Sequence, residues 1–274
     1  MKPILLPLAA AIAALALASP ATAAVGSWAS GAKAKVRLLS EGVGPDGRLV
    51  AGIEIVLPAG WKTYWRNPGT AGVAPKFDFS TSANLASVDV SFPVPHRSED
   101  GFSVTNVYED RVVLPVSAGI VDPTKPVDFA ATLDLGVCRE VCVPDRIEAH
   151  LAVSPADADA IAGKILAAAR ALLPAAPAPG VFAVESVARN GGTDAKPVFR
   201  IRAVLPAGAK PDMFIEGPDD WSPYAPTFAG VDGGRALYDV KFSRTGARTP
   251  ITGAHIRITI SAAGQAIEQT IGLD

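Results

Sequence analysis

Short alternating segments between prolines and glycines are the feature that most limits how this 274-residue chain can fold. The chain contains 24 prolines and 25 glycines, and between them apolar and polar residues alternate in short runs. A period of two residues with frequent turn signals is typical of antiparallel strands in β-sandwiches. We therefore predict an all-β fold.

The runs that we predict to be strands fall into two groups. In the first half they are residues 33–40, 48–57, 87–92, 112–116, 127–135 and 146–153. In the second half they are residues 181–189, 198–205, 236–243, 255–261 and 266–272. The first two runs flank the turn sequence Gly44-Pro45-Asp46-Gly47, which predicts a β-hairpin.

A helix and a proline-rich linker are predicted between the two groups of strands. Ser154, Pro155 and Asp157 form a helix-starting sequence, and apolar residues at helical spacing follow as far as Pro174. Residues 174–180 are proline and alanine with a final glycine, a stiff linker composition. The predicted divisions are a leader (1–24), a first β domain (25–153), the helix and linker (154–180) and a second β domain (181–274).

A five-residue sequence occurs once in each predicted domain. Val56-Leu57-Pro58-Ala59-Gly60 follows an early strand of the first half, and Val204-Leu205-Pro206-Ala207-Gly208 does so in the second. The second copy lacks the aromatic cluster that directly follows the first, and it has no cysteine after it. We therefore place the chemistry in the first domain and assign the second a supporting or docking role.

The first 24 residues have the pattern of a cleaved secretory signal peptide. Lys2 precedes an apolar run from Ile4 to Ala18, and an Ala-x-Ala sequence follows at Ala21-Thr22-Ala23. Removing this segment changes the net charge from −2 to −3, which disfavours nucleic acid and anionic membranes as partners. No later stretch is apolar enough for stable membrane insertion, so we expect an exported, periplasmic protein.

Cys138 and Cys142 are the two cysteines of the chain. On a straight strand, residues four apart are about 13 Å from each other, whereas bridged Cα atoms lie within about 7 Å. A disulfide between them therefore requires a tight turn at Arg139-Glu140-Val141. The pair can be a structural disulfide, a soft-metal site or a redox pair.

Each of these three hypotheses makes its own demand on the sequence. A bridge that closes about five residues stabilises a domain by only about 2 kcal/mol. A Cu(I) site would need a third ligand beside the cysteines, for which His96 and His150 are the candidates. A redox pair needs a thiolate, which Arg139 and Arg146 favour and Glu140 opposes.

An aromatic segment, residues 60–69, follows the first copy of the repeated sequence and reads Gly-Trp-Lys-Thr-Tyr-Trp-Arg-Asn-Pro-Gly. Its aromatic side chains suit a buried core followed by a loop, and they equally suit a shield over a reactive site. Residues 95–103, further along, are mostly polar and are predicted to be a solvated connection.

Three motifs together resemble the periplasmic N-terminal domain of DsbD-type thiol:disulfide interchange proteins. They are Pro95-His96, the segment Tyr108-Glu109-Asp110-Arg111-Val112-Val113-Leu114-Pro115-Val116, and Cys138-Arg139-Glu140-Val141-Cys142-Val143-Pro144. The aromatic segment at residues 60–69 is closer to the ScsB branch, which is linked to copper tolerance and carries a second immunoglobulin-like domain. The resemblance covers mainly residues 28–153.

The resemblance implies two immunoglobulin-like β-sandwich domains and a thiol:disulfide oxidoreductase activity without a cofactor. Cys138 and Cys142 would be the redox pair, with Cys142 meeting the partner. The implied cap is the loop at residues 98–103; its shielding residues would be Phe102, Glu99, Asp100 and Tyr108. The implied partners are a membrane-embedded DsbD- or CcdA-like electron donor and thioredoxin-fold periplasmic proteins. A Cu(I)-binding chaperone using Cys138, Cys142 and His96, and a non-catalytic module with a structural disulfide, remain the alternatives.

Overall fold

A computed structural model describes residues 25–99, 101, 103–154, 159–244, 246 and 248–274. Its elements are β1 (Ala29–Ser30), β2 (Lys35–Val43), β3 (Leu49–Val56), β4 (Lys62–Gly69), β5 (Lys76–Asp78), β6 (Leu85–Val90), β7 (His96–Glu99), β8 (Val104–Glu109), β9 (Arg111–Ile120), β10 (Val127–Cys138), β11 (Cys142–Val153), α1 (Ala160–Arg170), β12 (Ala183–Thr193), β13 (Lys196–Val204), β14 (Asp212–Glu216), β15 (Ser222–Pro223), β16 (Thr227–Asp232), β17 (Arg235–Ser243), β18 (His255–Ala262) and β19 (Gln265–Gly272). The predicted signal peptide lies outside the described residues.

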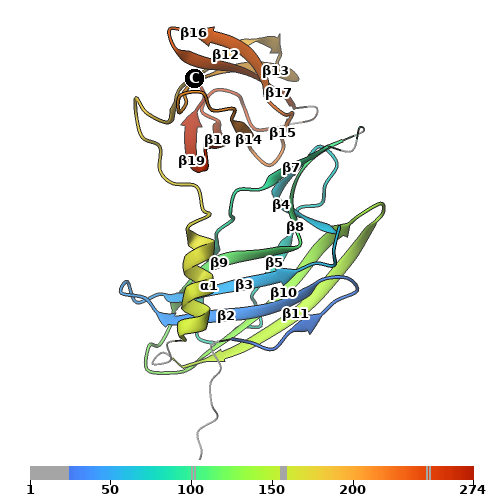
Figure 1. Cartoon of the computed structure of the whole chain (residues 1–274), viewed down its shortest axis with the longest axis vertical. Helices are drawn as coiled ribbons and strands as arrows, with labels where there is room; N and C mark the ends of the chain where they lie inside the picture. The colour runs from blue at the N-terminus through green and yellow to red at the C-terminus, as the bar shows by residue number, and fades with distance from the viewer. Residues whose placement is uncertain (1–24, 100, 102, 155–158, 245, 247) are drawn as a thin grey trace, which may run out of the picture.

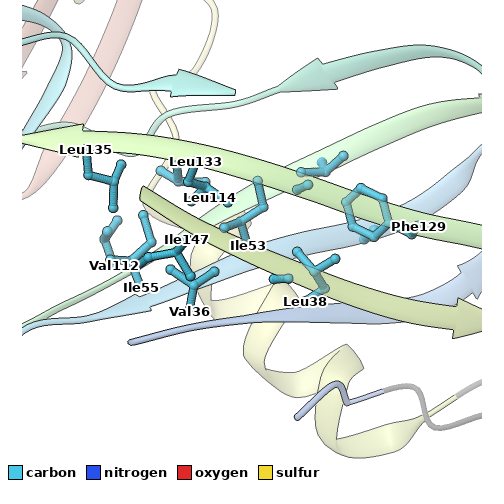
Figure 2. Packing of buried hydrophobic residues seen from close by; sticks show 14 of the residues in the cluster. Val36, Leu38, Ile53, Ile55, Val112, Leu114, Phe129, Leu133, Leu135 and Ile147 are labelled. Atoms are coloured by element: carbon cyan, nitrogen blue, oxygen red, sulfur yellow. The ribbon is translucent and has the colours of Figure 1, made fainter. Parts of the chain in front are cut away.

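Two antiparallel sheets form the first domain (Figure 1). One has the strand order β1-β2-β3-β9-β6, and the other has the order β11-β10-β4-β8-β7 with β5 added beside β10. Buried aliphatic and aromatic side chains from both sheets meet between them, as Figure 2 shows for Leu38, Ile53, Leu114, Phe129 and Leu133. Alternation along each strand sends every second side chain into this core, which is why the period-two pattern was visible in the sequence.

The predicted strands are present, and the Gly44–Gly47 turn joins β2 to β3 as an antiparallel hairpin. Two segments differ from prediction. Residues 62–69 form β4, a central strand between β10 and β8, and residues 96–99 and 104–109 form the β7–β8 hairpin rather than a solvated connection. Strand β4 was missed because its partners come from distant parts of the chain and its sequence ends in Asn-Pro-Gly, a turn signal.

The second domain is also built from β-sheets, which confirms the all-β, immunoglobulin-like prediction. One sheet has the order β12-β13-β17-β15 with β16 beside β17, and the other has the order β14-β18-β19. Its core contains buried residues from both sheets, among them Phe199, Ile201, Phe242, Ile256 and Ile258.

The two copies of the repeated sequence form matching turns. Trp61 N donates to Pro58 O at 3.0 Å, and Ala209 N donates to Pro206 O at 3.1 Å. Gly60 and Gly208 both have a positive φ, 74° and 69°, a conformation that glycine adopts without steric cost. Each turn leads into the next long strand of its domain, β4 or β14.

Helix α1 packs on the first domain and begins later than predicted. Its N-cap is Asp159, whose carboxylate accepts hydrogen bonds from the backbone N–H groups of Ile161 and Ala162, so the prediction of Ser154 as the cap is wrong. Asp159 satisfies two N–H groups that have no partner inside the helix. Buried residues of the helix contact Leu39 and Val113 on the outer face of the β2–β3–β9 sheet. The helix is therefore a layer of the first domain, not a connector between domains.

The domains meet where β4 and β7 approach β14 and β19. Arg66 of β4 pairs with Glu216 at 2.7 Å and also with Glu268, while the neighbouring Trp65 ring lies 5.7 Å from that of Phe214. Arg97 of β7 donates to Asp212 at 2.7 Å. Two strands of the first domain are thereby attached to the second by charged contacts.

Among the residues that the structure describes, no helix is long and apolar enough to span a bilayer.

Candidate functional site

A disulfide closes the tip of the β10–β11 hairpin. Cys138 and Cys142 are the last register pair of the two strands, with Cα atoms 4.1 Å apart. Arg139 N donates to Val141 O at 3.2 Å across the turn between them. The predicted tight turn at Arg139-Glu140-Val141 is confirmed.

The two sulfur-bearing residues differ in their access to solvent. Cys138 is only 2% exposed, whereas Cys142 is exposed, as is the adjacent Val141. Cys138 faces outward from its sheet, but side chains of β4 and β8 cover it, and it forms a small buried cluster with Tyr64 and Val107. A thiol from another protein can thus reach Cys142 far more easily than Cys138.

Strand β4 brings a tyrosine to the disulfide. Lys62 is the register partner of Cys138, and Thr63 Oγ1 donates to Gly136 O at 3.0 Å. The next residue whose side chain points to the same face as Lys62 is Tyr64. Its hydroxyl oxygen lies 3.1 Å from Cys138 Sγ and 3.5 Å from Cys142 Sγ, and the residue is 4% exposed.

Two glycines leave space for the Tyr64 ring. A Cβ atom placed on Gly72 would lie 2.6 Å from a carbon of the ring, and one placed on Gly136 would lie 3.2 Å from it. Real Cβ atoms do not approach ring carbons as closely as the first of these distances, so a side chain at Gly72 would displace the tyrosine. The ring is therefore held in close packing beside the sulfurs.

The predicted charged residues near the cysteines are mostly engaged with one another. Arg139 and Glu140 form an exposed ion pair at 3.7 Å in the turn itself. Arg146 pairs with Asp134 at 2.9 Å further down the hairpin. Since each arginine has a carboxylate close by, its favourable effect on a nearby thiolate is reduced. Lys62, beside Cys138 in the sheet, donates to Ser98 Oγ at 3.0 Å.

The residues predicted to shield the pair are not all brought to it. Asp100 and Phe102 lie outside the described residues, and Glu99 is an exposed residue at the end of β7. Tyr108 is in the core between the sheets, on the opposite face of β8 from Val107, and its hydroxyl donates to Pro93 O at 2.5 Å. Burial raises the pKa of Tyr108 well above its usual value of 10.0. The assignment of Tyr108 to the shield is therefore corrected.

The histidine candidates for a metal site lie apart from the cysteines. In the described parts of the chain, no three histidine, cysteine or acidic side chains come close enough together to hold a metal ion. His96 is therefore not joined to the cysteine pair. His150 is instead paired with Asp128 across the β10–β11 hairpin.

Two residues of the site were missed by the sequence analysis. Tyr64 was recognised only as a member of an aromatic segment with two possible roles. Asp145 was not singled out, although it is 2% exposed and accepts hydrogen bonds from the backbone N–H groups of Ala32, Lys33 and Ala34 at 2.7–2.8 Å. It anchors β11 three residues after Cys142. The alternation of Lys62 and Tyr64 with Thr63 and Trp65 was the available signal for Tyr64.

Comparison with known proteins identifies the domain that carries this site. No curated protein matches the chain. The crystal structure of the N-terminal periplasmic domain of ScsB from Proteus mirabilis is similar in fold, with a TM-score of 0.69 at 21% sequence identity, covering 92% of this chain and 99% of that one. Residues 36–153 match the family model of the N-terminal domain of thiol:disulfide interchange protein DsbD.

Proposed function

We propose that this protein is an exported thiol:disulfide oxidoreductase whose Cys138–Cys142 disulfide exchanges with protein partners. The observation that carries the proposal is the contrast between the two sulfurs at one hairpin tip. Cys142 is exposed to an incoming thiol, and Cys138 is buried against Tyr64. Exchange passes through a mixed disulfide, which needs one reachable sulfur and one that waits beside it.

The contrast assigns a role to each cysteine. A thiolate of the partner attacks Cys142 Sγ, the bond to Cys138 Sγ breaks, and its electron pair leaves on Cys138. The mixed disulfide between the partner and Cys142 is resolved either by return of Cys138 or by a second thiol of the partner. In the second case the pair in this protein is reduced to two thiols and the partner is oxidised to a disulfide.

A purely structural role is less well supported by the position of the bond. The two strands that it joins are already paired along their whole length by a register running from Val127–Val153 to Cys138–Cys142. A bridge across so short a turn removes little freedom from the unfolded chain, about 2 kcal/mol in the chain-entropy model.

The proposed partners follow from the family of the domain. Electrons would come from a membrane-embedded donor of the DsbD or CcdA kind and pass to thioredoxin-fold proteins in the periplasm, with no bound cofactor. The loop at residues 98–103, with Phe102, is proposed as a cover of the pair in the resting protein. Lys62 supports this placement because it links the cysteine strand to Ser98.

Equilibration with glutathione tests the proposal directly. A reduction potential of roughly −300 to −180 mV is expected for the pair in the full chain, the range in which exchange with periplasmic partners is reversible. A potential far below this window would identify the bond as structural and overturn the proposal.

Trapping in periplasmic extracts tests the roles of the two sulfurs. The Cys138→Ser variant should accumulate a reducible covalent complex with a thioredoxin-fold or membrane protein, because Cys142 can react but the resolving thiol is missing. The Cys142→Ser variant should give little complex. The reverse pattern would exchange the two assignments, and absence of complexes from both variants would contradict exchange with proteins.

A further inference from the structure

Among the residues that the structure describes, Tyr64 brings a hydroxyl group close to both sulfurs, and this inference about it rests on the proposed exchange function. We propose that Tyr64 is a catalytic residue whose hydroxyl stabilises the thiolate that leaves on Cys138 when a partner attacks Cys142. Its oxygen lies 3.1 Å from Cys138 Sγ and within 3.5 Å of Cys142 Sγ.

The direction of this hydrogen bond is fixed by the oxidation state. In the disulfide neither sulfur carries a hydrogen, so the phenol must donate and the sulfur accepts. A phenol ordinarily has a pKa of about 10 and a thiol of about 8.5, so a phenol beside a thiol keeps its proton when the thiol loses one. The same O–H group can therefore donate first to the disulfide and then to the thiolate.

The step is balanced without a further reactant. The partner thiolate supplies the electron pair of the new bond to Cys142 Sγ. The old bond between the sulfurs breaks, and its electron pair stays on Cys138 Sγ, which carries the negative charge. Tyr64 keeps its proton throughout. Its hydroxyl lowers the energy of the charged sulfur by donating a hydrogen bond to it. Water later supplies the proton when Cys138 becomes a neutral thiol.

Burial explains why Cys138 needs such a donor. A thiolate removed from water is disfavoured, and Cys138 is 2% exposed, so without a donor its departure would be slow. The charged residues around it are already engaged: Lys62 on β4 donates to Ser98, and Arg139 in the turn pairs with Glu140. Glu109, opposite Lys62 on β8, adds a negative charge that would oppose the thiolate.

The strand that carries Tyr64 is fixed on both sides of it. Thr63 is bonded to Gly136 of the cysteine hairpin, and Arg66, two residues further on, is held by Glu216 and Glu268 of the second domain. Gly72 and Gly136 pack against the ring itself. The hydroxyl is thereby preorganised for the charge that develops on Cys138, which is the arrangement that favours a transition state.

The test is the Tyr64→Phe substitution in the full chain, which keeps the ring and removes the oxygen. Reduction of the disulfide by dithiothreitol should slow by roughly three- to tenfold, because a leaving thiol of higher pKa departs more slowly. In a Cys142→Ser background, absorbance of the thiolate should show the pKa of Cys138 rising by about one unit on the same substitution.

Tyr108→Phe is the matched control, because it removes the hydroxyl of another buried tyrosine, bonded to Pro93 O rather than to sulfur. It should lower thermal stability but leave the reduction rate and the pKa of Cys138 unchanged. Equal rates and equal thiol pKa values for wild type and Tyr64→Phe would overturn the role of Tyr64. If the wild-type disulfide resists dithiothreitol until the protein unfolds, the exchange function itself fails.

Discussion

The two domains use the same local plan for different purposes. In each, a Pro-Ala-Gly turn with a left-handed glycine leads into a strand, β4 or β14, which pairs with the first strand of a hairpin, β10–β11 or β18–β19. At the tip of the first hairpin stand Cys138 and Cys142. At the tip of the second, Ala262 pairs with Gln265 around Ala263 and Gly264.

Strands β4 and β14 differ in the side chains that they carry. Strand β4 places Tyr64 next to the sulfurs and Arg66 next to the other domain. Strand β14 instead carries Asp212 and Glu216, which form ion pairs with arginines of the first domain. The framework therefore does not supply the chemistry. A few side chains distinguish the copy that carries the candidate active site from the copy whose carboxylates pair with Arg66 and Arg97.

The largest expected effect comes from removing the cysteines, the sharpest difference between the two hairpin tips. The double substitution Cys138→Ala and Cys142→Ala should abolish exchange with glutathione completely. The free energy of unfolding should fall by no more than about 2 kcal/mol, because the closed loop is short. Urea unfolding measures this, and a loss of twice that size would mean that the bond is a structural support.

The second largest effect is expected from removing a buried carboxylate of the first domain. Its loss of free energy of unfolding is compared with that from removing an exposed carboxylate of the second domain. Asp145→Ala removes three hydrogen bonds to backbone N–H groups and should lower the free energy of unfolding by about 3 kcal/mol. Asp220 also accepts from two backbone N–H groups, those of Arg248 and Thr249, but in an exposed site. Its alanine variant should have a much smaller effect in the same urea titration; similar effects would show that burial is not what distinguishes the two sites.

Weakening the contact between the domains should have an intermediate effect on the free energy of unfolding. Arg66→Ala leaves Glu216 and Glu268 without their shared partner in a partly buried interface, and a loss of about 2 kcal/mol is expected. Arg170→Ala is the control, because its pair with Glu41 is more exposed and should contribute less than about 1 kcal/mol. If β4 is braced by the second domain, Arg66→Ala should also slow reduction by dithiothreitol, whereas Arg170→Ala should not.

The smallest effect tests whether the two turns are equivalent. Gly60→Ala and Gly208→Ala each place a Cβ on a residue with positive φ, so each should destabilise its domain by about 1 kcal/mol. Calorimetry on the full chain would compare them. Clearly unequal losses would show that the resemblance of the turns does not extend to their energetics.

Much of the fold could be read from the sequence because the period of two residues is a local signal. The β2–β3 hairpin and the turn between the cysteines are examples, and both depend on residues close together in the chain. Strand β4 could not be read in this way. Its aromatic residues and terminal Asn-Pro-Gly have no decisive local preference, and its place between β8 and β10 is set by pairing with residues about 45 and 75 positions away.

The same limit applies to the site. Cys138 and Cys142 were evident from their spacing, but the position of Tyr64 depends on which face of β4 meets β10. Only the register between Lys62 and Cys138 determines this. Tyr108 was predicted to shield the pair, yet alternation along β8 turns its side chain into the core.

The packing of helix α1 also determines where the chain can be cut to give a soluble fragment of the first domain. Leu166 lies directly over Gly52, where a Cβ atom would collide with it, and Ala162 and Ala169 contact the same outer face of the sheet. A first domain cut after Val153 would expose Leu39 and Val113 to water as an apolar surface next to paired strands, a surface prone to self-association. A soluble fragment that retains the cysteine site should therefore extend through Arg170, with the cut placed in the proline-rich segment that follows.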